Sequence, residues 1–166
     1  NRLYKNTING FSKPDKSSSS KKLKNISVIL DHRLGIAPSY FKEIGEHLNI
    51  PKNNISVLTF FKHRKDINEE NSMSSYCRED ISNLGVLNDT LSDFCSRKSD
   101  VLINFYIKDD INLKYISAKK DKNLSVGFKS VDLALNDLIL EVDAQNIEVF
   151  ISECIKYLKI FFTTKK

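Results

Sequence analysis

The stretch Val101–Ile107 reads Val-Leu-Ile-Asn-Phe-Tyr-Ile and is the most apolar strand-like run in this 166-residue chain. A strand that is covered on both faces is a nearly continuous apolar run, whereas a strand with one wet face alternates apolar and polar residues. A short run that is rich in aliphatic and aromatic residues favours a strand over a helix. The stretch therefore predicts a strand near the centre of a buried parallel sheet.

The rest of the chain alternates between strand-like and helix-like segments. Short apolar runs predict four further strands, at Ile26–Asp31, Ile55–Phe61, Leu124–Phe128 and Leu138–Val142. Apolar spacing and capping residues predict helices at Pro38–Leu48, Asn88–Lys98, Ile111–Lys119 and Asn146–Phe162. Strands that alternate with helices form βαβ units with right-handed crossovers. We therefore expect an α/β three-layer sandwich with a mostly parallel five-stranded sheet, Rossmann-like or flavodoxin-like, and helices on both faces.

Two segments lack such a pattern. Residues 62–83 are polar and have no sustained period, which predicts a long loop with at most one short element. Residues Ser12–Ser20 are polar and low in complexity, which is typical of a flexible linker. We expect a basic flexible N-terminal segment over residues 1–24 and a single α/β domain over residues 25–166.

The positive charge of the chain lies in the N-terminal segment. Of the 26 basic and 21 acidic residues, residues 1–24 hold seven and one, which leaves 19 basic and 20 acidic residues in the body. A nucleic-acid-binding domain usually carries its basic residues on a structured face, and the body gives no such indication. The segment instead predicts contact with an anionic partner, through the lysines Lys13, Lys16, Lys21, Lys22 and Lys24.

The three cysteines, Cys77, Cys95 and Cys154, are widely spaced and form no Cys-x-x-Cys motif. This pattern argues against a disulfide framework and a structural zinc site, and it favours a reducing compartment such as the cytoplasm. Cys77 lies in the polar loop, which makes it the thiol expected to react. No apolar run approaches the ~20 residues that span a bilayer, so no membrane span is expected.

A short repeat opens three of the predicted strands. It reads Asn25-Ile26-Ser27-Val28, Asn54-Ile55-Ser56-Val57 and Asn123-Leu124-Ser125-Val126. In one interpretation, a short polar residue ends each preceding loop and aliphatic residues then enter a parallel sheet. In the other, asparagine precedes strands by chance in a chain that is rich in lysine and asparagine.

Charged residues follow the predicted strands at the points where the strands end. In an open parallel sheet, ligands bind beyond the carboxyl ends of the strands, near the reversal of strand order. The candidate ligand-binding rim comprises Asp31, His32, Arg33, His63, Arg64, Asp109, Asp110 and Lys129. Histidines with charged neighbours favour general acid–base chemistry, but charged residues also follow strands simply because the chain surfaces there.

The sequence lacks the motifs that would identify a cofactor or a nucleophile. Residues 31–37, the first turn after a strand, contain one glycine, whereas a dinucleotide site needs three. There is no P-loop and no Gly-x-Ser-x-Gly elbow, so we expect no cofactor and name no catalytic residue. Asp109 and Asp110 suit a magnesium ion, but Asp110 is better placed to cap the following helix, so no metal is expected.

The C-terminal half resembles a known family in five segments: Asp100–Tyr106, Leu113–Ala118, Ser125–Phe128, Leu135–Leu140 and Phe150–Leu158. It is similar to an uncharacterised small α/β domain family of unknown function from Bacteroidota, over residues 20–162. The resemblance implies a bacterial, cytoplasmic protein and carries over no catalytic residue. A fainter, fold-level similarity is to the N-terminal domain of heptosyltransferase-type glycosyltransferases, which would lack the half that binds the sugar donor.

These observations favour a binding or interaction module without catalytic activity of its own, with an unidentified protein partner. One alternative is a small enzyme, or a transferase-like remnant of one, that uses the rim at the carboxyl ends of the strands. The other is a protein that associates with RNA or the ribosome through residues 1–24, a hypothesis with weaker support.

Overall fold

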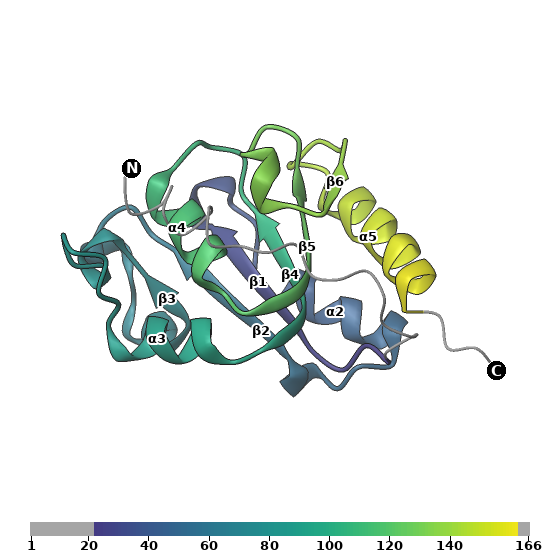
Figure 1. The fold of residues 1–166 in the computed structure, drawn as a ribbon, viewed down its shortest axis with the longest axis horizontal. Coiled ribbons are helices and arrows are strands. Elements are labelled where there is room, and N and C mark those ends of the chain that lie inside the picture. Colours follow the sequence, from purple (N-terminus) through teal and green to yellow (C-terminus); the bar gives the residue numbers. More distant parts are fainter. Residues whose placement is uncertain (1–21, 163–166) are drawn as a thin grey trace.

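The computed structural model describes residues 22–162, which form one parallel sheet between two layers of helices (Figure 1). The six strands are β1 (Ile26–Asp31), β2 (Ile55–Phe60), β3 (Ser75–Tyr76), β4 (Ser99–Phe105), β5 (Lys122–Phe128) and β6 (Leu138–Leu140). The α-helices are α2 (Ser39–Leu48), α3 (Asp89–Ser96), α4 (Ile111–Lys119) and α5 (Ile147–Phe161). Within residues 22–162, every helix is too short or too polar to cross a bilayer.

The strand order is β3-β2-β1-β4-β5-β6, and every pairing between neighbouring strands is parallel. The chain adds strands outward from β1 in one direction and then outward from β4 in the other. This is the order of the Rossmann fold and not that of flavodoxin. The predicted central position of Val101–Ile107 is confirmed, because β4 lies beside β1 in the middle of the sheet, although it runs from Ser99 to Phe105.

The expected number of five strands is wrong, because β3 is a sixth. This strand is two residues long and pairs with β2 only at Thr59↔Ser75 and Phe60↔Tyr76. A strand of two residues has no period that a sequence pattern could show. It lies inside the segment 62–83 that we expected to be a long loop, so tertiary pairing alone defines it.

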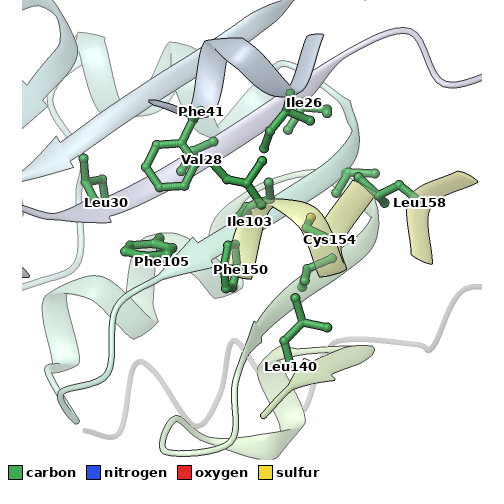
Figure 2. Packing of buried hydrophobic residues seen from close by; sticks show 14 of the residues in the cluster. Ile26, Val28, Leu30, Phe41, Ile103, Phe105, Leu140, Phe150, Cys154 and Leu158 are labelled. Carbon is green, nitrogen blue, oxygen red and sulfur yellow. The ribbon is translucent and has the colours of Figure 1, made fainter. Parts of the chain in front are cut away.

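Helices cover both faces of the sheet, as predicted. Helices α2 and α5 lie side by side on one face, and α3 and α4 lie on the other (Figure 1). On the first face the ring of Phe105 in β4 lies 5.0 Å from Phe41 of α2 and 4.8 Å from Phe150 of α5. Figure 2 shows these rings gathered between the two helices and the strand. Such edge-to-face contacts bury large apolar areas, so they fix both helices to the sheet.

The asparagines of the repeat tie neighbouring strands together at their amino ends. The Asn25 side chain accepts a hydrogen bond from the amide of Asp100 (2.8 Å), and the carboxylate of Asp100 accepts from the amide of Lys24 (2.8 Å). The Asn54 side chain donates to the carbonyl of Lys24 (3.0 Å), and that of Asn123 donates to Asp100 (3.3 Å). The repeat thus marks parallel strands whose starts are joined, which favours the first of its two interpretations.

We predict that Phe150→Ala lowers the free energy of unfolding by about 3–5 kcal/mol, because it leaves a cavity beside Phe105. The matched control is Phe161→Ala on the same helix, where the ring is 54% exposed. That change should cost less than about 0.5 kcal/mol. Urea unfolding followed by circular dichroism measures both, and equal losses would contradict the packing described here.

Candidate functional site

Three residues of the predicted rim meet where the strand order reverses, between the carboxyl ends of β1 and β4. The guanidinium of Arg33 bridges two carboxylates, with Nε 2.8 Å from Asp31 and Nη2 3.0 Å from Asp110. Asp31 is fully buried, whereas Arg33 and Asp110 are largely but not completely covered. The guanidinium also lies 5.4 Å from the ring centre of Phe60. The rim therefore holds a compact ion-pair network at the position where α/β proteins bind ligands.

Each carboxylate in this network also caps a helical turn. Asp31 accepts from the amide of Arg33 (3.0 Å) at the start of the 3₁₀ turn His32–Leu34, which Gly35 closes at a φ of 69°. Asp110 accepts from the amide of Asn112 (3.0 Å) and caps α4, as predicted. Hydrogen bonding to Asp31 raises the pKa of Arg33, and this outweighs burial, which lowers it. The charges of the network are thus satisfied by one another and by backbone amides.

The other five rim residues lie outside this network. His32 stacks on Phe61, with ring centres 4.2 Å apart, and His63 is exposed. Asp109 pairs with Lys114, and Lys129 pairs with Glu141 (2.9 Å) at the surface. Arg64 pairs with Asp80. Among the described residues, no hydrogen bond or ion pair joins either histidine to the network.

Asp80, which the sequence analysis did not single out, organises the segment that precedes α3. Its carboxylate accepts from the side chains of Arg64 and Asn88 and from the amide of Cys77 (2.9 Å). Burial by itself would raise the pKa of Asp80, but hydrogen bonds from Arg64 and Cys77 hold that pKa below its usual value. The spacing Cys77-x-x-Asp80 is that of a capping box, but a cysteine in the cap position gave no recognisable signal.

The expectation that Cys77 is the reactive thiol is wrong. Cys77 is buried, its thiol donates to Asp80 (3.4 Å), and burial is the main cause that raises its pKa to about 12. Cys95 and Cys154 are also buried, on the inner faces of α3 and α5, and burial raises their pKa values to about 11 and about 12.

A chain of buried polar side chains extends from β4 towards β6. The hydroxyls of Tyr106 and Ser117 are 2.7 Å apart, Ser117 donates to Asn104 (2.8 Å), and Asn104 donates to Asn136 (2.8 Å). A Cβ on Gly127 would lie 2.5 Å from the Asn136 amide nitrogen, so only glycine leaves room for this side chain. The Asn136 side chain thus reaches into the interior, where it meets the side chain of Asn104 on β4.

A pocket of about 420 Å³ lies at the opposite edge of the sheet, beside the amino ends of β1, β2 and β4 and the end of α3. Three serines on these strands form a row along it. The Ser27 hydroxyl lies 2.6 Å from that of Ser99 and 2.9 Å from that of Ser56. Ser27 and Ser56 are two of the three serines of the repeat and are paired in register. The repeat is therefore the sequence signal that could have indicated this site.

Basic side chains from the ends of α3 and α4 also line the pocket. Lys120 is buried, its ammonium donates to the carbonyl of Arg97, and it lies 4.9 Å from the ring centre of Phe94. Burial lowers the pKa of Lys120 to about 8. The Arg97 side chain pairs with Asp93 (2.7 Å), and Lys98 lines the pocket beside them.

Within residues 22–162, no group of three or more His, Cys, Asp or Glu side chains is arranged to hold a metal ion. Of the lysines assigned to an anionic partner, Lys13, Lys16 and Lys21 lie outside the described residues, and Lys22 and Lys24 are exposed. The protein partner, the cytoplasmic location and the association with RNA stay predictions.

We predict that none of the three thiols reacts readily with a disulfide reagent in the folded protein. At about pH 8 their raised pKa values leave ~100-fold or more less thiolate than an ordinary cysteine has. In concentrated guanidinium chloride all three should react. Absorbance at the wavelength of the released thiol measures both states, and rapid labelling of Cys77 in the folded protein would contradict its burial.

No curated protein and no solved structure matches the chain. The model of a family described as a family of unknown function, DUF6913, matches residues 1–161, which include the basic N-terminal segment. The expected kinship to an uncharacterised domain family is confirmed, whereas an origin in Bacteroidota and a similarity to glycosyltransferases stay predictions. Since the match covers nearly the whole sequence, this chain belongs to the DUF6913 family of unknown function.

Proposed function

We propose that this protein is a binding module that holds a small-molecule ligand in the pocket at the amino edge of its sheet. The observation that carries the proposal is the contrast between the two edges. At the carboxyl edge Arg33 is held between Asp31 and Asp110, whereas the amino edge is hollowed by the 420 Å³ pocket. The volume falls in the range of about 300–1,000 Å³ that is usual for small-molecule sites.

The charged residues at the carboxyl edge bind one another and backbone amides, which supports a structural role for them. A general acid or base must be able to exchange a proton with a substrate. Asp31 is fully buried and accepts from both the amide and the guanidinium of Arg33, and Asp110 caps α4. Removal of Arg33 would leave Asp31 as a buried carboxylate without a counter-ion, which is strongly destabilising. We therefore assign these residues a role in stabilising the fold. This favours a binding module over an enzyme that would use this rim for catalysis.

The chemistry of the pocket supports the binding of a small polar molecule. Its lining includes the hydroxyls of Ser27, Ser56 and Ser99 and the apolar side chains of Met73 and Phe94. A few polar groups beside apolar walls are typical of sites that orient a small ligand.

We predict that Arg33→Met lowers the free energy of unfolding by about 3–5 kcal/mol, because it breaks a buried ion pair. The control is Arg78→Met, at an exposed arginine, which should cost less than about 0.5 kcal/mol. Urea unfolding measures both changes. A folded, fully stable Arg33→Met protein would favour the alternative in which the rim serves catalysis.

The proposed function is tested by the molecule that the protein retains. The full chain is purified from its native organism, and small molecules released from it are identified by mass spectrometry. Ser56→Trp fills the pocket from an exposed position in its lining. Lys129→Trp places the same bulk at an exposed position on the carboxyl edge. We expect the wild type and Lys129→Trp to retain the same molecule and Ser56→Trp to lose it.

The opposite pattern, loss in Lys129→Trp and retention in Ser56→Trp, would place the ligand on the rim and overturn the proposal. Equal retention in all three proteins would also overturn it. Circular dichroism checks that both variants are folded, and both substitutions are at side chains outside the core.

A further inference from the structure

We propose that the ligand of this pocket carries an oxyanion, a phosphate or a carboxylate, bound between Lys98, Lys120 and the row of serine hydroxyls. The inference rests on the proposed function and names the chemical class of its ligand. Three features of the pocket carry it: a hydroxyl hydrogen without an acceptor, an ammonium group with few acceptors, and an excess of positive charge.

The serine row leaves one donor unused. Each of the three hydroxyls has one hydrogen, and the two contacts along the row use two of the three. Among the described residues, Ser27, Ser56 and Ser99 make no other side-chain hydrogen bond that could use the third. The row ends at the exposed Ser56 and the buried Ser99, and both line the pocket. The pocket therefore offers a hydroxyl hydrogen to an acceptor from outside the chain.

The ammonium group of Lys120 is also short of acceptors. It has three N–H donors, of which one is directed to the carbonyl of Arg97, while the ring of Phe94 covers another side. The residue is 1% exposed but lines the pocket, so the pocket is the side from which an acceptor would reach its ammonium group. Burial also removes hydration from the ammonium group, which lowers the pKa of Lys120 to about 8. An oxyanion would supply both acceptors and the opposite charge, and charge-assisted hydrogen bonds are the stronger kind.

The charges of the lining exclude a cationic ligand. The ionisable groups in the pocket are Asp93, Arg97, Lys98 and Lys120. Asp93 and Arg97 form a two-point pair, with contacts of 2.7 Å and 3.0 Å, and neutralise each other. Two ammonium groups remain. A wholly apolar ligand would bury the unused donors without partners, which is costly.

The test uses three compounds with a similar hydroxylated carbon chain: glycerol, glycerate and glycerol phosphate. Each is titrated into the ¹⁵N-labelled full chain at constant ionic strength, and the amide signals near Ser27, Ser56 and Ser99 are followed by NMR. We expect at least one anion to shift these signals with a Kd about tenfold or more below that of glycerol. The tighter of the two anions identifies the group as phosphate or carboxylate.

Three variants locate the anion. Lys120→Met and Lys98→Met should each weaken the binding of the tighter anion by about tenfold. Lys156→Met removes an exposed lysine of α5 on the other face of the sheet and should leave binding unchanged. Lys98 is exposed, so its variant keeps the test valid if the buried Lys120→Met protein does not fold.

Two results would overturn the inference. If glycerol binds as tightly as both anions, or if neither anion shifts the pocket signals, the oxyanion class is wrong even when Ser56→Trp loses a retained molecule. If the anions bind but Lys98→Met and Lys156→Met weaken them equally, the binding is a general surface effect. Failure of the proposed function is a separate result, namely retention of the native ligand by Ser56→Trp.

Discussion

The burial of the central strands on both faces is the constraint on which the rest of this structure depends. All six residues of β1 are buried, and β4 is buried almost throughout. Helices α2 and α5 cover one face of this pair, and α3 and α4 cover the other. Two covered faces leave little room for charge in the interior. Most polar groups of the central strands are therefore confined to the two edges of the sheet, where the strands begin and end.

The two edges satisfy their polar groups in different ways. At the carboxyl edge, Arg33 joins the end of β1 to the start of α4 by pairing with Asp31 and Asp110. At the amino edge, hydrogen bonds of asparagine and serine side chains connect the first residues of neighbouring strands. These short side chains leave the space beside the strands open. This difference explains why the hollow lies at the edge where α/β proteins less often bind ligands.

The direction of the helices explains why lysines are favourable at the amino edge. In a parallel sheet with helical crossovers, the helices end at the edge where the strands begin, so their last carbonyls gather there with partial negative charge. The ammonium groups of Lys120 and Lys122 donate to carbonyls at the ends of α3 and α4, those of Arg97 and Ser117. Burial lowers the pKa of each lysine to about 8. Of these two lysines, Lys120 also lines the pocket.

The sequence by itself determined the local elements of this protein, because apolar periodicity and capping are local. Ile26–Asp31 and Ile111–Lys119 match β1 and α4 residue for residue, and Asp110 is the predicted cap. Tertiary structure alone decided the pairing of Arg33 with Asp110, 77 residues away, the burial of Cys77 beside Asp80, and the two-residue strand β3. It also decided that Ser27 and Ser56, two of the three serines of the repeat, line a pocket. These features depend on which strands become neighbours, and no local pattern encodes the order of strands in a sheet.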